Sequence, residues 1–572
     1  MATVTNIAGD EARSRKEWNP ATTGLTGAQA FVACLAEEGL EYVFHVPGGQ
    51  TLSILDALID HPQIKVITAR HECAAVCMAD VYGRLTGRPA MVMSTTGPGA
   101  TNLITGVGNA HRDSTPMIVV TVNNNRREIG YDEAQDADHV QVMRQFVKST
   151  RFVTDPENVV VAAREAFRHA LTGNAGPAHI DFARDSIEKG EIDFEPLAGR
   201  ATRPLLPAIA HPDAIRAAAD VIRAAKRPVI WAGRGAINAN AGEELVRFAE
   251  TIGAAVATTY NGIGAFPGRH ELSIGPRSKW GGRVPNRVFS EADLVILVGN
   301  SMNSISTTRW TMKLPEIVQI DIDPLSIGKR YPVRAGVLGD AAAALAALTG
   351  ELQDLKRPDG DHKAWLESIA AERAKWQQAC FREEYADASP VKPQRVMQAL
   401  AEKFDDDTVF VYDAGNAGIW SHMVPVQKPR NYIKPVGFGA MAFALGGAIG
   451  AKLTRPDDTV LALIGDGSMA MSLGELETAI RYHLPIIVMV FNDLAYGNIK
   501  QLQSKMYGQR YIGTELGDSM FHDVARAMGA DGERVISGAD LENAIERAKV
   551  SKVPYVIDIL IDDTESIWDD PF

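Results

Sequence analysis

Short apolar runs recur along the chain, and each ends at glycine or polar residues before a stretch with helical spacing. The clearest case lies in the last third. Residues 459–464 form a β-branched and apolar run that ends at Gly465-Asp466-Gly467, and a second run, residues 486–491, ends at Asn492. The helix between them is indicated by four apolar residues that share one face, Leu473, Leu476, Ala479 and Ile480. This order predicts a strand, turn, helix and strand of a parallel sheet.

A similar layout lies near the N-terminus. Residues 91–95 run into Gly97-Pro98-Gly99, a helix is predicted over residues 101–110, and a strand over residues 117–122 is closed by Asn123. Nearly the same spacing separates the glycine turn, the next proline and the Asn in both copies. We therefore expect two duplicated α/β domains, of which only the second carries an acidic residue in its turn and a metal.

The remaining apolar runs complete three α/β domains, each built on a doubly wound parallel sheet. They lie at residues 42–46, 64–68, 229–232, 255–258, 294–298, 317–322 and 409–412, with a further helix at 243–252. Proline-rich and polar stretches separate the domains. The predicted division is a flexible N-terminus at 1–23, a first domain at 24–190, a linker at 191–209, a middle domain at 210–350, a linker with a charged helical run at 351–392, a third domain at 393–561 and a C-terminal tail at 562–572.

Composition narrows the class of function. The chain has 572 residues, of which 46% are hydrophobic and 23% charged, and a formal net charge of −13. These values are typical of a soluble globular enzyme and argue against nucleic acid or an anionic membrane as a partner. Four cysteines without C-x-x-C spacing, no apolar signal core and no uninterrupted apolar run of membrane length predict a cytoplasmic protein that acts on small molecules.

The residues that end the two strands of the last third predict a metal and phosphate site. Carboxyl ends of parallel strands meet at one edge of a sheet, so Asp466 and Asn492 should converge there. Their oxygens, with a backbone carbonyl of the turn after Asn492, form an all-oxygen set that suits Mg²⁺ or Ca²⁺. Gly467 and Ser468 leave backbone N–H groups at a helix start, where a phosphate is favoured. A plain helix cap at Asp466 is the alternative.

The Gly-Asp-Gly turn, followed after 24 residues by Asn-Asp, resembles the signature of thiamine diphosphate enzymes. Arg70-His71-Glu72, residues 95–103 (TTGPGATNL), residues 134–138 (AQDAD) and Gly439-Ala440-Met441 resemble the branch that contains acetolactate synthase, pyruvate oxidase and benzoylformate decarboxylase. The likeness covers nearly the whole chain. It implies pyrimidine-binding, middle and diphosphate-binding domains, thiamine diphosphate and Mg²⁺ as cofactors, and a homodimer or homotetramer with active sites between subunits.

The resemblance also implies roles for individual residues. Glu72 matches the catalytic Glu, Gln135 matches a pocket glutamine, and Met441 matches the bulky side chain that bends the cofactor. The implied metal ligands are Asp466, Asn492 and the carbonyl of Leu494. The implied cofactor contacts are Glu72, Asn416, Ala417, Gly439, Met441, Gly465, Gly467, Ser468, Asn492, Tyr496 and Gly497.

Position in the sequence alone leaves the roles of two candidate residues open, Glu72 and His111. Glu72 follows the strand at 64–68 and opens a helix rich in apolar residues, so it lies beside apolar surface that suits a carboxylic acid with a shared proton. A carboxylate stabilised by the helix N-terminus is an equal alternative, which the resemblance decides. His111 is a candidate catalytic residue, as a proton donor or a carboxylate ligand, or else a partnered structural histidine.

Two segments depart from the pattern of the family. Residues 301–305 (SMNSI) stand where biosynthetic acetolactate synthases carry Arg-Phe-Asp-Asp-Arg, and Gln501-Leu502 stand in place of Gln-Trp. No His-His pair is present, unlike in simple pyruvate decarboxylases. These differences weaken the expectation of FAD and of acetohydroxyacid synthesis and indicate a different acceptor pocket. Its candidates are residues 46–50, His111, Gln135, Trp280, Asn303, Tyr496 and Trp568.

The middle domain has a weak nucleotide signature. Gly233 and Gly235 would let the backbone approach FAD or the ADP part of coenzyme A, and Asp321 and Asp323 would face a ribose. Ordinary turn chemistry and strand-end capping explain the same four residues. Basic side chains that would meet the phosphates of a CoA nucleotide are Arg234, Arg277 and Arg283.

We therefore expect an acetolactate synthase-like enzyme that decarboxylates a 2-oxo acid and transfers the acyl carbanion to an aldehyde or keto acid. A 2-hydroxyacyl-CoA lyase or oxalyl-CoA decarboxylase, with a CoA nucleotide in the middle domain, is the second hypothesis. A binding protein that keeps the fold without turnover is the third.

Overall fold

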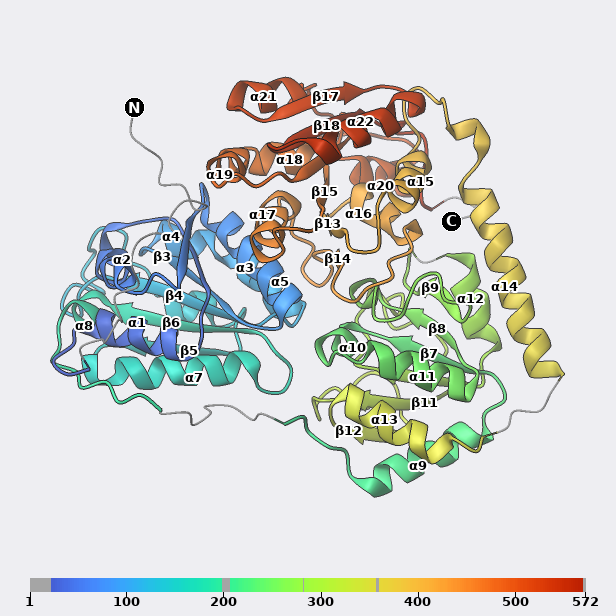
Figure 1. The fold of residues 1–572 in the computed structure, drawn as a ribbon, viewed down its shortest axis with the longest axis horizontal. Helices are drawn as coiled ribbons and strands as arrows, with labels where there is room; N and C mark the ends of the chain where they lie inside the picture. Colours follow the sequence, from blue (N-terminus) through green and yellow to red (C-terminus); the bar gives the residue numbers. More distant parts are fainter. Residues whose placement is uncertain (1–21, 198–205, 281, 356–359, 569–572) are drawn as a thin grey trace.

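The computed structural model describes residues 22–197, 206–280, 282–355 and 360–568. Most of the predicted flexible start at 1–23 therefore lies outside the described residues, as do parts of both predicted linkers and of the C-terminal tail. The described chain forms three lobes, each around its own sheet (Figure 1). Among the described residues, no helix is long and apolar enough to cross a bilayer.

The first lobe contains a six-stranded sheet in the order β2-β1-β3-β4-β6-β5. Its strands are β1 (Tyr42–His45), β2 (Lys65–Thr68), β3 (Ala90–Ser94), β4 (Met117–Asn123), β5 (Ser149–Val153) and β6 (Pro177–Ala183). Its helices are α1 (Gly27–Glu37), α2 (Leu52–Ile59), α3 (Glu72–Thr86), α4 (Pro98–Asn102), α5 (Ile104–Arg112), α6 (His139–Met143), α7 (Val159–Leu171) and α8 (Arg184–Glu188). The helix predicted over residues 101–110 is thus two helices, with Leu103 between them.

The middle lobe has the order β12-β11-β10-β7-β8-β9. Its strands are β7 (Pro228–Ala232), β8 (Ala255–Thr258), β9 (Ser273–Pro276), β10 (Leu294–Val298), β11 (Glu316–Asp321) and β12 (Ala335–Leu338). Its helices are α9 (Pro212–Ala224), α10 (Arg234–Asn238), α11 (Gly242–Ile252), α12 (Arg283–Glu291) and α13 (Ala341–Leu352). Counted from β9, this is the 3-2-1-4-5-6 order of dinucleotide-binding sheets.

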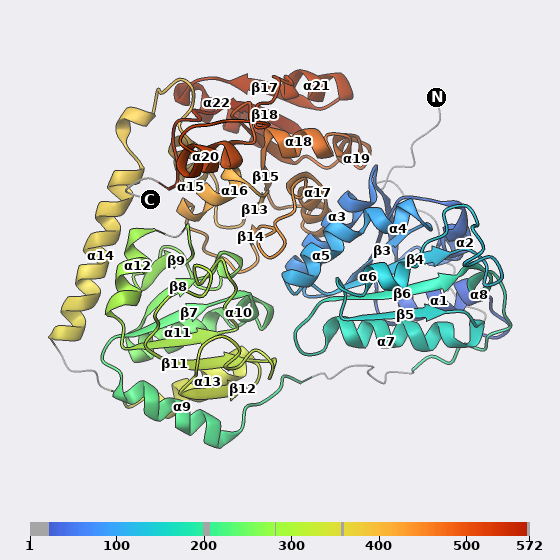
Figure 2. The ribbon, with the colours of Figure 1, turned by 180° about the vertical axis from the view of Figure 1, so that it is seen from behind.

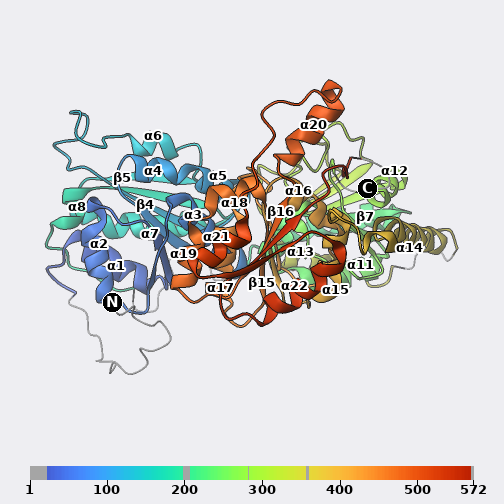
Figure 3. The same cartoon turned by 90° about the horizontal axis from the view of Figure 1, so that it is seen from above.

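The third lobe has the order β14-β13-β15-β16-β18-β17. Its strands are β13 (Val409–Tyr412), β14 (Tyr432–Ile433), β15 (Val460–Gly465), β16 (Ile487–Asn492), β17 (Asp531–Val535) and β18 (Tyr555–Leu560). Its helices are α15 (Pro393–Lys403), α16 (Asn416–Trp420), α17 (Ala444–Thr454), α18 (Asp466–Ser472), α19 (Glu475–Arg481), α20 (Gly497–Tyr507), α21 (Phe521–Met528) and α22 (Gly538–Val550). Figure 3 shows α20 standing out from the body of the lobe.

Every pairing between neighbouring strands in the three sheets is parallel, which confirms the predicted α/β class. The first and third sheets also share one strand order, because β1 to β6 correspond in sequence to β13 to β18. The two predicted copies therefore have the same topology. The middle sheet has another order and is not a third copy.

The first and third lobes pack through their small-residue helices. α3 lies along α17, and the views in Figures 1 and 2 agree on this contact. A Cβ on Gly446 would lie 3.1 Å from the carbonyl oxygen of Ala74, and a Cβ on Gly450 only 2.7 Å from Cα of Met78. Since both glycines bring the two backbones together, the glycine-rich start of α17 fixes how the first lobe meets the third.

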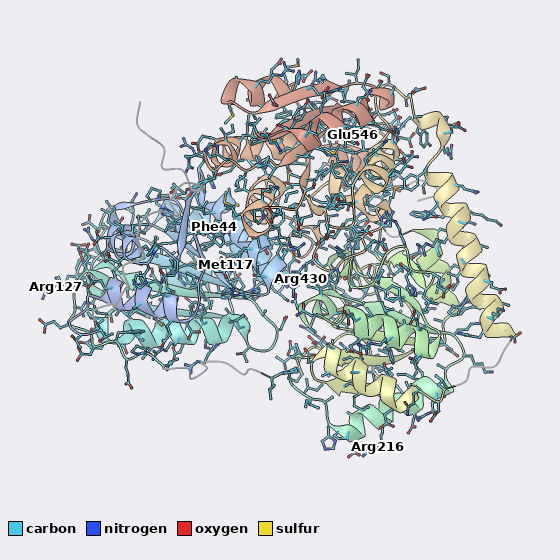
Figure 4. The ribbon with its side chains drawn as sticks, viewed as in Figure 1. Phe44, Met117, Arg127, Arg216, Arg430 and Glu546 are labelled. Atoms are coloured by element: carbon cyan, nitrogen blue, oxygen red, sulfur yellow. The ribbon has the colours of Figure 1, made fainter. Side chains whose placement is uncertain are left out.

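Two further features hold the three lobes together. Arg430 lies where they meet (Figure 4) and donates to the carbonyl of Arg84 in the first lobe and to Oδ1 of Asn240 in the middle lobe. The predicted linker at 351–392 holds a long helix, α14 (Asp361–Cys380), which runs along the outer side of the middle and third lobes. These contacts fix the positions of the carboxyl edges of the sheets relative to one another.

Candidate active site

The site begins at the carboxyl edge of the third sheet, where two neighbouring strands end. β15 pairs with β16 so that Gly465 lies opposite Phe491, which sets Asp466 next to Asn492. Asp466 opens α18, and its Oδ2 accepts from the backbone N–H of Ala495 at 3.1 Å. The predicted convergence of the GDG turn and the Asn-Asp turn is therefore present.

The orientation of Asn492 suits a cation ligand. Its Nδ2 donates to Oδ1 of Asp558 at 2.8 Å, so the amide oxygen is turned toward the following turn. Leu494 takes a positive φ of 53°, and its carbonyl accepts from the N–H of Leu516 at 2.8 Å while one lone pair stays open. Oxygens of Asp466, in the turn after β15, and of Asn492 and Leu494, in the turn after β16, thus lie at one edge of the sheet, as the metal hypothesis requires.

Buried negative charge at this edge also favours a cation. Burial raises the pKa of Asp466 to about 6. Burial, together with the neighbouring charge of Asp466, raises the pKa of Asp493 to about 7. Within the described part of the chain neither carboxylate has an ion-pair partner. The described residues contain no group of three or more His, Cys, Asp or Glu side chains that would hold a metal by themselves, so a metal here would also need neutral oxygen ligands. A divalent ion bound by one carboxylate and two neutral oxygens fits this donor set.

Four of the predicted cofactor contacts surround the same turn. A Cβ on Gly467 would lie 2.5 Å from the ring of Tyr496, and a Cβ on Gly497 would lie 2.9 Å from Nδ2 of Asn416 and would overlap the carboxylate of Asp493. Each position therefore has room only for glycine. The structure thus brings the start of α16, the start of α18 and the start of α20 close together.

Asp413 ties the start of α18 to the segment that carries Gly439 and Met441. Its Oδ2 accepts from the N–H groups of Phe443 and Ala444 at 2.9 and 3.0 Å, and its Oδ1 accepts from Oγ of Ser468 at 3.1 Å. Burial raises its pKa to about 6. Sequence reasoning gave Asp413 no role of its own, although a polar residue directly after the strand at 409–412 was a usable signal.

Glu72 lies at the first turn of α3 and is half-buried. Its Oε2 accepts from Nδ2 of Asn102 at 3.0 Å. The preceding residues are tied to the third lobe, since Glu475 accepts from the N–H groups of Arg70 and His71 at 2.9 Å each. None of the contacts described for this chain joins Glu72 to Asp466 or Asn492, and the apolar surroundings predicted for Glu72 are only partly present within a single chain.

The Gly97 turn of the first lobe gathers two other predicted residues. Gln135, at a positive φ of 63°, accepts from Oγ1 of Thr96 through its backbone oxygen at 3.0 Å, and a Cβ on Gly97 would lie 2.9 Å from its Cβ. Gln50 accepts from Oγ1 of Thr95 at 2.6 Å. The same turn lies beside Glu72, because a Cβ on Gly99 would lie 3.6 Å from its Oε1. Glu72, Gln135 and the 46–50 loop therefore share one edge.

His111 does not lie at that edge. It is close to the end of α5, which runs from the carboxyl edge back to the start of β4. Burial, aided by the charges of Arg112 and Lys148, lowers the pKa of His111. The structure thus separates His111 from the other candidate catalytic residues by the length of a helix.

The remaining acceptor-pocket candidates fall into separate places. Trp280 and Trp568 lie together, with ring centroids 6.4 Å apart and the ammonium group of Lys279 4.3 Å from the ring of Trp280. Tyr496 belongs to the metal turn. Asn303 serves a local turn, since its Oδ1 accepts from the N–H of Ser306 at 2.8 Å.

The glycines of the middle lobe are used for packing within the chain. A Cβ on Gly235 would lie 2.6 Å from Cα of Gly299, and a Cβ on Gly233 would lie 2.8 Å from Cα of Asn300. Asp321 accepts from the N–H of Asp323 at 3.0 Å, as in a capped strand end. Turn chemistry accounts for these residues without a nucleotide.

Three family models match successive parts of the chain. They are the N-terminal TPP binding domain of thiamine pyrophosphate enzymes over residues 25–143, the central domain over 215–348 and the C-terminal TPP binding domain over 413–559. The chain is also similar along most of its length to acetolactate synthase large subunits. It is 34% identical to a probable one from Methanocaldococcus jannaschii (95% of this chain, 93% of the relative) and 33% identical to one from Buchnera aphidicola (95% and 96%). It is 31% identical to the isozyme 3 large subunit from Escherichia coli (95% and 96%).

Proposed function

The chain belongs to the family of thiamine pyrophosphate enzymes, and we propose that it decarboxylates a 2-oxo acid and joins the remaining acyl unit to an aldehyde or a second keto acid. It is a thiamine diphosphate-dependent carboligase of the acetolactate synthase type. Its relatives do not favour the CoA-lyase and non-catalytic hypotheses. The observation that carries the proposal is the set of Asp466, Asn492 and Leu494 at one edge of the sheet, beside the starts of α16, α18 and α20.

In the proposed site each part of this set has one task. Mg²⁺ would be held by an Oδ of Asp466, Oδ1 of Asn492 and the carbonyl oxygen of Leu494. The N–H groups of Gly467 and Ser468, with Asn416 and Ala417, would bind the diphosphate, and Gly465, Tyr496 and Gly497 would lie beside it. Asp413 holds the segment with Gly439 and Met441 at a fixed distance from the start of α18.

Thiamine diphosphate, when bound, supplies a carbon nucleophile and an electron sink for breaking the bond next to a carbonyl. The chain's own residues then have to move a proton at the other end of the cofactor. Glu72 is the proposed group, with Asn102 holding its carboxylate in place at 3.0 Å. Gln135 and the 46–50 loop, on the same edge, are proposed to face the substrate.

We infer that the working enzyme is a homodimer or homotetramer. Glu72 is half-buried within one chain and contacts none of the proposed diphosphate-binding residues in the part of the chain that is described. A second copy that brings its diphosphate edge against the Gly97 turn would complete the site and cover Glu72. The free thiols of Cys34, Cys73, Cys77 and Cys380 support the proposed cytoplasmic location.

The test is a reaction panel with purified full-length protein, thiamine diphosphate and Mg²⁺. We expect CO₂ release from pyruvate or another 2-oxo acid and a ligated product when an aldehyde or keto acid is added. Activity only on a 2-hydroxyacyl-CoA or on oxalyl-CoA would overturn the proposal. The visible absorption bands of flavin in the same preparation decide whether FAD occupies the middle lobe.

A further inference from the structure

A cleft lies between the middle and third lobes, away from the carboxyl edge that holds the proposed cofactor site. Its walls come from the β8–β9 region, α12, α14 and residues 422–426. The empty volume is about 730 Å³, part of it open to solvent. The lining is mostly apolar and includes Ile263, Phe266, Ile274, Val284, Met423 and Val426. A largely apolar lining at an interface between domains is typical of small-molecule sites.

Two residues that line this cleft, His422 and Trp376, each have a buried polar atom without a partner in the described structure, Nε2 and Nε1 respectively. His422 is only 7% exposed. Its Nδ1 lies 2.9 Å from the carbonyl oxygen of Ile419, and because a carbonyl only accepts, Nδ1 carries the proton. Nε2 of the neutral ring is therefore a free acceptor, and burial keeps the ring neutral by lowering its pKa to about 4.

Trp376 supplies the complementary group. Its indole N–H is a donor only, and its ring centroid lies 6.2 Å from that of His422. A single atom that both donates and accepts, placed between the two nitrogens, would satisfy both of them. A buried acceptor and a buried donor without hydrogen bonds cost free energy, so a ligand that bonds to both nitrogens is favoured.

The charged residue on the wall is not available to a ligand as a donor. Nη1 of Arg373 donates to the carbonyls of His270 and Ser273 at 2.8 Å each, and Nη2 donates to the carbonyl of Gly268 at 2.7 Å. These bonds hold the arginine flat against the backbone. Besides the polar side chains of Thr258, Ser273 and Gln377, the chemistry left for recognition is apolar surface plus the unpartnered acceptor of His422 and the unpartnered donor of Trp376.

We propose that this cleft binds a small molecule with an apolar body and one hydroxyl group, which donates to Nε2 of His422 and accepts from Nε1 of Trp376. A carboxylate has no hydrogen to donate to His422, and an ammonium group has no lone pair to accept from Trp376, so neither satisfies both atoms. None of the residues that line the cleft is a proposed cofactor contact or metal ligand. It adjoins α16 through the carbonyl of Ile419, which also accepts from the hydroxyl of Tyr260 at 3.1 Å.

The experiment uses benzyl alcohol as the probe, with toluene and benzyl methyl ether as matched compounds, on the full chain loaded with thiamine diphosphate and Mg²⁺. Binding is measured by ligand-observed NMR titration and located by a crystal soak. We expect benzyl alcohol to bind about three- to tenfold more tightly than toluene, since each neutral hydrogen bond contributes modestly. The ether keeps the acceptor but has no donor, so we expect it to lose the contribution of His422.

The protein-side test is Trp376→Phe, which removes the N–H and keeps an aromatic ring. This substitution should weaken the binding of benzyl alcohol about three- to tenfold and leave the binding of toluene unchanged. Unchanged binding of toluene also shows that the variant is folded. Trp310→Phe is the control, because Trp310 lies outside the cleft and donates to the carbonyl of Met302. Equal binding of benzyl alcohol and toluene to the wild type, equal binding of benzyl alcohol to wild type and Trp376→Phe, or a soaked alcohol found elsewhere would overturn the proposal.

Discussion

Asp493→Asn is predicted to stabilise the cofactor-free protein at neutral and higher pH. Asp493 is half-buried next to Asp466, and its pKa is raised from the ordinary 3.8 to about 7, first by burial and then by that neighbour's charge. A carboxyl with a higher pKa in the folded chain binds its proton more tightly there than in the unfolded chain. Its contribution to stability is therefore complete below about pH 3.8 and is lost as the pH rises through about 7.

The magnitude follows from the size of the rise. About three pKa units at about 1.4 kcal/mol each give a loss on the order of 4 kcal/mol across the whole range. Part of this loss is already present at about pH 5, and partial exposure and coupling to Asp466 reduce it. We therefore expect the stability advantage of the Asp493→Asn variant over the wild type to grow by about 2–3 kcal/mol between about pH 5 and about pH 8.

Urea unfolding of both cofactor-free proteins at the two pH values measures this difference directly. Mg²⁺ with thiamine diphosphate should shrink the advantage at pH 8, because the bound cation neutralises the same buried charge. An advantage that does not change with pH, or an Asn variant that is less stable than wild type at pH 8, would refute the reasoning about buried charge at this edge.

Three further predictions concern other parts of the account. Glu72→Gln should lower turnover at least about 100-fold through loss of the proton-transfer group while cofactor affinity by calorimetry changes little, and unchanged turnover would remove Glu72 from the mechanism. Gly450→Ala should lower the free energy of unfolding in urea by about 1–3 kcal/mol or more, because the added Cβ would meet the backbone of Met78. The control is Gly350→Ala on α13, where the added Cβ meets open space, so its effect should be neutral or stabilising. Equal effects of the two substitutions would contradict the packing of α3 on α17. Asp413→Asn should weaken cofactor binding about tenfold or more. The amide keeps only one acceptor oxygen and cannot accept both from the N–H groups of Phe443 and Ala444 and from the N–H of Ala414. Wild-type affinity would exclude a positioning role.

Most of the strands that the sequence predicted are central ones, although the edge strand β2 was also predicted and the inner strands β6 and β18 were not. Central parallel strands are buried on both faces and therefore appear as unbroken apolar runs, such as Leu294–Val298 and Val409–Tyr412. The edge strands β5 (STRFV) and β17 (DGERV) are largely polar, because one side of an edge strand meets solvent. No run of apolar residues marks them.

Which residues of the candidate site could be predicted from the sequence depends on how close they lie to one another along the chain. Asp466 and Asn492 were predictable because they follow adjacent strands within one unit of the chain. The role of Asp413 and the separation of His111 from Glu72 depend on where loops and helix ends lie in space. The cleft between the lobes depends on contacts between residues far apart in sequence, such as Tyr260 with Ile419, for which the sequence has no local signal.

The central claim is that Asp466 anchors a divalent ion and, through it, the diphosphate of the cofactor. Isothermal titration calorimetry of thiamine diphosphate with Mg²⁺ tests it directly on the wild type, on Asp466→Ala and on Asp457→Ala, an exposed aspartate just before β15 that serves as the control. We predict that Asp466→Ala weakens binding at least about 100-fold, as expected for loss of a charged metal ligand, while Asp457→Ala binds like the wild type. Wild-type affinity in the Asp466→Ala protein would contradict the account.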